Sequence, residues 1–292
     1  MRPATGSLFS PMRSESIGVQ RGSLANLVAV VVPMHNRKEI TADEEISFRH
    51  LIRFLDRYDK YLVLPESLDL RIPGFLQRHF SDRFFGSITA HIRLMLSRGF
   101  YEAFREYEYI LVYHTDALVF SDQLMQWCES GLDYVGPPWL NCPDTPWVKT
   151  PKVGNGGFSL RKVSSFLKIF DSRRYAVDPE EYWRKTYASV PTLERYMNLH
   201  KRYLKRLRFF NGVRREMADW PKVSWRNEDH FWSDRGTHYF PEFKVADFDT
   251  GLRFGFEAAP RLCFELNGRK LPFGCHAWPK YDRAFWEPYL LR

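Results

Sequence analysis

The feature that most constrains this chain is a continuous apolar run, LVAVVV, over residues 27–32, which Pro33 ends. A run of this length, rich in β-branched residues, is typical of a strand buried on both faces of a parallel sheet. An amphipathic pattern follows over residues 43–58, and a second apolar run follows at residues 61–65. Strand, helix and strand at these lengths predict a βαβ unit, and therefore an α/β fold.

The same alternation continues along the chain, and 44% hydrophobic residues in 292 can build a sizeable core. We expect further strands at residues 84–88, 109–113, 133–136 and 154–160, helices at 89–106 (with a break at Gly99), 123–130 and from Lys162, a loop at 137–152, and a long basic helix at 192–210. Residues 1–25, rich in Ser, Gly, Arg and Pro, are predicted to be a flexible leader. Residues 26–292 are predicted to form one domain with a mostly parallel, twisted central sheet and helices on both faces.

Charge and cysteine usage narrow the class of protein. The net charge of +8 suits either a solvated surface or an anionic partner: a nucleotide diphosphate, a membrane phosphate or a nucleic acid. Four cysteines without a CxxC pair argue against a zinc ribbon and favour a reducing cytoplasm. No apolar run reaches about 18 residues, and no apolar segment follows the first arginines, so we expect neither a transmembrane helix nor a secretory signal.

A candidate ligand site lies at the end of the strand predicted for residues 109–113. His114, Thr115 and Asp116 follow that strand directly. Open parallel sheets bind ligands beyond the carboxyl ends of their strands, and a carboxylate there can hold a divalent metal against a diphosphate. The alternative is that Asp116 only caps the following segment.

Three further segments carry residues suited to chemistry. Residues 154–161, GNGGFSLR, contain three glycines, which let a backbone approach a ligand closely or simply make a tight turn. Glu228 and Asp229 open a predicted helix, where acids either serve as a general base or only complement the helix dipole. His276 stands in an aromatic loop and suits either a metal ligand or a structural role.

Taken in order, these segments resemble a bacterial and fungal family of uncharacterised, glycosyltransferase-like domains. The matching segments are Thr115-Asp116-Ala117, Asp133-Tyr134-Val135-Gly136-Pro137-Pro138-Trp139, residues 154–161, Glu228-Asp229-His230-Phe231-Trp232 and Pro272-Phe273-Gly274-Cys275-His276. The resemblance spans roughly residues 27–282 and implies a GT-A-type, Rossmann-like fold and a nucleotide-sugar donor, with UDP-sugar favoured. It also implies transfer of a hexose to a hydroxyl of a glycan, a lipid-linked or a small-molecule acceptor, as in polysaccharide biosynthesis.

The resemblance assigns residues to roles. The donor is expected to contact Val32, Pro33, His35, Arg93, Thr115 and Asp116. Sugar and acceptor are expected to contact Trp139, Asn155, Gly156, Gly157 and Trp232. A divalent metal, Mn²⁺ or Mg²⁺, is expected on Asp116 and His276. A full D-x-D motif is missing because position 114 is histidine, so either His114 joins the metal site or the protein does not depend on a metal.

For the chemical step, the resemblance favours Asp229 as the general base of an inverting displacement, with Glu228 as second choice. One alternative is a catalytically inactive, sugar- or nucleotide-binding relative of the same fold. A nucleic-acid-binding protein is disfavoured because no known motif accompanies the basic segment at residues 192–210. That segment is instead a candidate for peripheral contact with an anionic membrane at its inner, cytoplasmic face.

Overall fold

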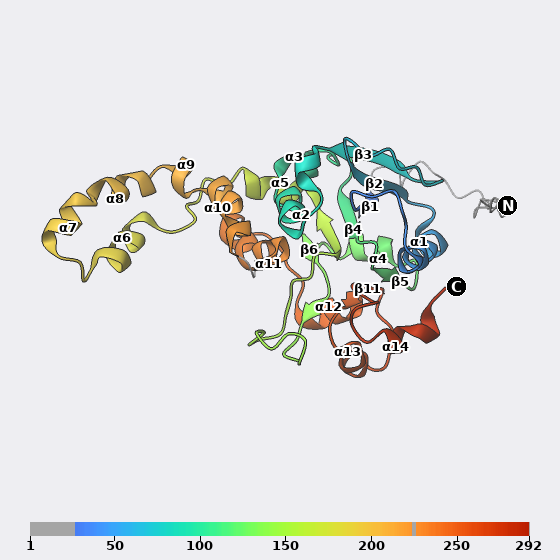
Figure 1. The fold of residues 1–292 in the computed structure, drawn as a ribbon. Helices are drawn as coiled ribbons and strands as arrows, with labels where there is room; N and C mark the ends of the chain where they lie inside the picture. Colours follow the sequence, from blue (N-terminus) through green and yellow to red (C-terminus); the bar gives the residue numbers. More distant parts are fainter. Residues whose placement is uncertain (1–26, 224–225, 292) are drawn as a thin grey trace, which may run out of the picture.

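The computed structural model describes residues 27–223 and 226–291, so the leader predicted for residues 1–25 lies outside the described part. Its centre is a six-stranded sheet in the order β3-β2-β1-β4-β9-β6 (Figure 1). These strands are β1 (Val28–Pro33), β2 (Asp59–Pro65), β3 (Leu76–Phe80), β4 (Tyr109–Tyr113), β6 (Tyr134–Val135) and β9 (Phe158–Lys162). The four strands β3, β2, β1 and β4 are parallel, whereas β9 runs antiparallel to both of its neighbours. The predicted βαβ unit and the mostly parallel sheet are confirmed.

Helices cover both faces of this sheet. On one face, the Tyr113 hydroxyl at the end of β4 donates a hydrogen bond to the carbonyl of Ser47 in α1 (Ala42–Leu55). On the other face, the Arg161 guanidinium in β9 donates to the hydroxyl of Tyr101 in α3 (Arg98–Glu102). Tyr113 pairs with Phe158 across the ladder, and Phe158 and Arg161 point to opposite faces because side chains alternate along a strand. The helix α5 (Val163–Phe170) joins the second face, where Phe166 stacks on Tyr101.

A smaller sheet and a second apolar cluster adjoin the C-terminal edge of the central sheet. The small sheet consists of β10 (Gly255–Phe256), β11 (Gly274–Cys275) and β5 (Leu118–Val119). It packs with α12 (Phe248–Phe254), α13 (Pro260–Leu266) and α14 (Arg283–Trp286) around the buried Trp278 and Trp286. This packing holds the segment around His276 against the end of β4, because the Trp278 amide donates to the Asp116 carbonyl.

The third strand differs from the prediction. Residues 84–88 form no strand: a 3-10 turn (Asp82–Phe84) ends there, and α2 (Ile88–Met95) begins at Ile88 after Ser87 caps it. The strand is instead β3, an edge strand with the half-exposed sequence LQRHF. An edge strand faces the core on one side only, so it lacks the continuous apolar run on which the prediction depended. The predicted break at Gly99 falls at residues 96–97, where Ser97 caps α3.

The long helix predicted for residues 192–210 is three short helices. They are α7 (Thr192–Met197), α8 (Leu199–Lys205) and α9 (Arg208–Asn211), and they follow α6 (Pro179–Tyr187). Together these helices form an arm, residues 178–210, that projects from the body of the molecule (Figure 1). The helix breaks at Asn198 and again at Leu207, because no core packs along its length to hold the turns in line.

All the cysteines of the chain lie in its interior. Cys128, Cys142, Cys263 and Cys275 are all buried free thiols. Burial raises the pKa of the Cys128 and Cys263 thiols to about 12, which keeps both protonated and unreactive. Across residues 27–223 and 226–291, no helix combines the length and the apolar character needed to cross a membrane.

We expect the central strands to carry the stability of the fold. Leu111 in β4 is fully buried between the helical layers, so Leu111→Ala leaves a cavity and should lower the free energy of unfolding by about 2–5 kcal/mol. The matched control is Leu76→Ala on the edge strand, where the side chain is half exposed, and we expect a loss of about 0.5 kcal/mol or less. Urea denaturation of both variants measures the difference; equal losses would contradict this account of the core.

Candidate active site

A pocket of about 860 Å³ opens at the carboxyl ends of β1 and β4. Its walls come from the loop after β1, the starts of α1 and α2, the end of β4, the glycine turn before β9, the start of α11 (Glu228–Tyr239) and the loop after β11. Segments that are far apart in the sequence therefore meet at one edge of the sheet, as expected for an open α/β fold.

Most of the predicted site residues line this pocket. They are Pro33, His35, His114, Thr115, Asp116, Trp139, Asn155, Gly157, Glu228, Asp229 and His276. The structure thus brings together the strand end, the glycine turn, the acid pair and the late histidine. It does not test the role assigned to each residue.

Four predicted residues do not line the pocket, and the structure corrects their placement. Trp232 has no exposed surface and packs on Phe166, so it cannot contact a sugar. Val32 is fully buried within β1, and Arg93 is exposed on α2, outside the pocket lining. Gly156 lies behind the pocket, where its carbonyl accepts hydrogen bonds from Ser159 and Arg161.

A cluster of histidines and carboxylates stands at the end of β4. The Nε2 atom of His276 lies 3.3 Å from an Asp116 carboxylate oxygen, and its Nδ1 atom lies 2.9 Å from Oε1 of Glu257. One ligand atom each from His114, Asp116 and His276 lie within 4.8 Å of one another. The Nε2 atom of His114 is buried without a hydrogen-bond partner among the described residues.

The charges of this cluster reinforce one another. Burial alone would raise the pKa of Asp116, but the adjacent His276 lowers it well below its usual range. Burial opposes the charge on His276 too, yet Asp116 and Glu257 raise the pKa of its imidazole well above the usual value. Burial, with His91 and His276 nearby, lowers the pKa of His114 well below its usual value. His114 is therefore neutral, and a neutral imidazole nitrogen can serve as a metal ligand.

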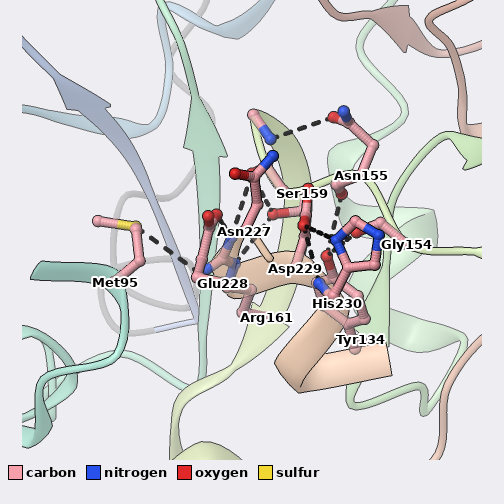
Figure 2. A network of polar contacts seen from close by, with 12 residues as sticks. Met95, Tyr134, Gly154, Asn155, Ser159, Arg161, Asn227, Glu228, Asp229 and His230 are labelled. Atoms are coloured by element: carbon pink, nitrogen blue, oxygen red, sulfur yellow. Dashed lines mark hydrogen bonds and ion pairs between the residues drawn. The ribbon is translucent and has the colours of Figure 1, made fainter. Parts of the chain in front are cut away.

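The acid pair lies across the glycine turn from this cluster, on a second flank of the pocket, at the first turn of α11. Figure 2 shows its polar contacts. Glu228 is buried and lies 3.5 Å from the guanidinium of Arg161. Burial, and next the negative charge of Asp229, raise the pKa of Glu228. Asp229 accepts hydrogen bonds through Oδ1 from the His230 amide at 2.8 Å and pairs with His230 Nδ1 at 3.1 Å.

The glycine turn separates the two flanks and needs its glycines for close approach. A Cβ on Gly156 would lie 2.4 Å from the Glu228 carboxylate, and one on Gly157 would lie 2.1 Å from Nε2 of His276. Asn155 holds the turn: its amide oxygen accepts from the Gly157 amide and its nitrogen donates to Glu257. Thr115 is similarly engaged, because its hydroxyl donates to Glu44 at 3.0 Å.

The sequence analysis missed four residues of the site. Glu257 orients His276, His91 packs edge-on against His114, Trp147 lies beside His230, and Arg161 anchors Glu228. Glu257 carried a weak signal, since it is an acid that directly follows the short apolar strand β10, whereas Asp116 lies three residues beyond the end of a longer strand. His91 and Trp147 carry no such signal, and Arg161 was included only as the last residue of the segment at residues 154–161, without a role of its own.

Residues 75–276 match the family described as "Protein of unknown function (DUF5672)", which covers more than half of the chain. The chain belongs to the DUF5672 family. The matched region includes the strand end, the glycine turn, the acid pair and His276, whereas the wall formed by the loop after β1 and the start of α1 lies outside it. No curated protein matches the chain.

Among solved structures, the DUF5672 chain is similar to glycosyltransferases. One is a glycosyltransferase involved in the glycosylation of the major capsid of PBCV-1, at 12% identity over 90% of this chain and 98% of that one, with a TM-score of 0.46. Another is the apo form of the glycosyltransferase GlyE in Streptococcus pneumoniae TIGR4, at 13% identity, 90% and 60% coverage and a TM-score of 0.42. A third is core-mannan synthase A (CmsA/Ktr4) from Aspergillus fumigatus in its Mn/GDP form, at 10% identity, 82% and 75% coverage and a TM-score of 0.42.

We expect Gly157→Ala to dismantle the histidine–carboxylate cluster without unfolding the chain. The new methyl group would push the His276 ring away from Asp116, so the pKa of His276 should fall toward the ordinary histidine value. An NMR titration of His276 measures this, with His276→Gln to assign the signal. The matched control is Gly99→Ala, whose Cβ meets nothing within 4 Å. An unchanged His276 titration in Gly157→Ala would contradict the geometry.

Proposed function

We propose that this protein is a glycosyltransferase that moves a sugar from a nucleotide-diphosphate donor, with UDP-sugar favoured, to a hydroxyl acceptor. One observation carries the proposal: a histidine–carboxylate cluster and a buried acid pair face the same pocket from opposite sides of a glycine turn. The cluster would hold a cation beside the departing diphosphate, and the acid pair would accept the proton of the incoming hydroxyl. A glycan or a lipid-linked sugar fits the acceptor role best, since the pocket is open and partly aromatic.

The residues of the cluster fit a divalent cation such as Mn²⁺ or Mg²⁺. His114, Asp116 and His276 would hold it, because their ligand atoms converge and the buried His114 Nε2 has no partner among the described residues. Glu257 would fix the His276 ring so that Nε2 faces the cation, the usual arrangement for metal-bound histidines. A bound cation supplies the positive charge that neutralises a departing diphosphate.

The charge of the pocket lining supports this requirement for a cation. Seven carboxylates line the pocket: Asp43, Glu44, Asp116, Asp144, Glu228, Asp229 and Glu257. Lys280 is the only lysine or arginine among the described lining residues. A diphosphate entering such a pocket would meet net repulsion unless a cation accompanied it.

Asp229 is our candidate for the general base. As the acceptor oxygen bonds to the anomeric carbon, its proton passes to the Asp229 carboxylate, and the bond from that carbon to the diphosphate oxygen breaks. The hydrogen bonds from His230 hold Asp229 in place. Glu228 is the second choice, since Arg161 already engages its carboxylate. With base and leaving group on opposite flanks, the displacement inverts the anomeric centre.

Aromatic rings beside the base offer a surface for the acceptor sugar. Trp139 stacks on His230 with ring centroids 4.3 Å apart, and Trp147 lies 5.3 Å from the same ring. Trp147 is 52% exposed, so part of its side chain is accessible to a ligand. Flat apolar rings with polar neighbours suit the apolar faces of sugars.

We expect Asp116→Asn to abolish the stabilisation that nucleotide diphosphates give in the presence of Mn²⁺. Ligand binding to the native state at about 100 times its Kd adds about 2.7 kcal/mol, which a thermal-shift screen with UDP and GDP resolves. The matched control Asp249→Asn, on an exposed turn of α12, should respond like the wild type. Mn²⁺-dependent stabilisation that survives in Asp116→Asn would remove this residue from the site.

We expect Asp229→Asn to lower turnover by about 10²-fold or more while donor affinity changes little, because an amide cannot accept the acceptor proton. Asp249→Asn again serves as control and should keep wild-type turnover. NMR of the product should give the anomeric configuration opposite to that of the donor. A retained configuration would contradict the single displacement, and full nucleotide binding without any transfer would favour an inactive relative.

A further inference from the structure

The arm, residues 178–210, exposes a concentration of large apolar side chains that no part of the described structure covers. Of the fourteen exposed large hydrophobic residues within residues 27–223 and 226–291, eight lie on the arm: Leu193, Tyr196, Met197, Tyr203, Leu204, Leu207, Phe209 and Phe210. Their exposed fractions reach 75% for Leu193 and 80% for Phe209. Neither α7 nor α8 buries a single residue. Such a concentration on a small segment marks an interaction surface.

The arm is basic: it carries eight lysines and arginines against four acids. The excess lies in residues 192–210, which carry six lysines and arginines against one acid, Glu194. Arg202 and Arg206 are paired with Glu180 of α6, which holds α6 against α8. Arg195, Lys201 and Arg208 are exposed and make no ion pair within the described residues. The surface therefore joins exposed apolar groups to an excess of positive charge.

We propose that the arm binds the surface of an anionic lipid bilayer. Leucine, methionine and phenylalanine gain by entering the boundary of the acyl chains, while lysine and arginine gain by contact with negative headgroups. A second copy of this chain is a poor partner for the same surface, because two arms of equal charge would repel. Nucleic acid is also a poor partner, because aliphatic side chains such as Leu193 and Met197 neither pair nor stack with bases.

The way the arm joins the body suits this role and is independent of the proposed enzyme activity. Tyr175 and Gly212 bridge at the base of the arm, and Asn211 ties Val177 there through two hydrogen bonds. The arm is thus fastened at one narrow point and extends from the body (Figure 1). It can contact a flat surface without the core or the pocket rearranging.

Flotation of the full chain with vesicles tests the proposal. We expect binding to vesicles of phosphatidylcholine with 30% phosphatidylserine, weak binding to phosphatidylcholine alone, and a decrease as salt rises. The triple variant Arg195→Glu, Lys201→Glu, Arg208→Glu should lose about 100-fold or more in affinity, at about fivefold for each lost cation. The matched control Arg105→Glu, Arg173→Glu, Lys270→Glu reverses three exposed charges elsewhere and should lose little.

A second set of variants tests the apolar part. Leu193→Ser, Met197→Ser, Phe209→Ser should weaken vesicle binding about 10-fold or more, even at high salt. Leu262→Ser, Leu266→Ser on α13 is the matched control, since both leucines are about half exposed on the body. Thermal unfolding must be unchanged in all variants. Vesicle binding that is absent or insensitive to salt would overturn the proposal, as would equal losses in the arm and control variants. Preferential binding of duplex RNA would also overturn it. So would concentration-dependent dimers that the Leu193→Ser, Met197→Ser, Phe209→Ser variant removes.

Discussion

The guanidinium of Arg161 is the interaction on which fold and site both depend. It has no exposed surface. Its nitrogens donate hydrogen bonds to the Ser159 hydroxyl, the Gly156 carbonyl, the Tyr101 hydroxyl on α3 and the Met95 sulfur. It also forms an ion pair with the Glu228 carboxylate (Figure 2). A buried charge is tolerated only where hydrogen bonds and a counter-charge satisfy it, and removal of one partner of such a pair typically costs about 3–5 kcal/mol. One side chain thereby joins the antiparallel strand, the helix behind it, the glycine turn and the start of α11.

This arrangement explains why the acid pair can exist where it does. Two adjacent carboxylates in a buried position repel each other, and burial already raises the pKa of Glu228. Arg161 compensates Glu228 from behind, and His230 holds Asp229 from the side. The glycines of the turn let both flanks of the pocket approach without side chains between them. A strand residue with no contact to the pocket therefore sets the electrostatics inside it.

The sequence predicted the elements that depend on local pattern and failed where tertiary contacts decide. The apolar runs at residues 27–33 and 109–113 predicted β1 and β4. Because open parallel sheets bind ligands beyond the carboxyl ends of their strands, the sequence also predicted that Asp116 would line the pocket. The edge strand β3 was missed because its exposed face breaks the apolar run. Trp232 was misassigned because the sequence around a tryptophan beside an acid pair does not distinguish a ligand-facing side chain from one buried in the core, where Trp232 lies. Roles that arise from packing, such as those of His91 and Arg161, have no signature in one sequence.

The distribution of charge links the pocket to the arm. The net charge of +8 left open a solvated surface or an anionic partner; the pocket lining is acidic, and residues 192–210 of the arm carry six of the basic residues. The basic excess therefore lies away from the pocket, and a diphosphate donor of the kind we propose would need a cation to enter the acidic lining. On the arm, the exposed charges would act on the anionic membrane surface that we propose, within a Debye length. Under the two proposals together, the pocket would concentrate cations while the arm would orient the molecule.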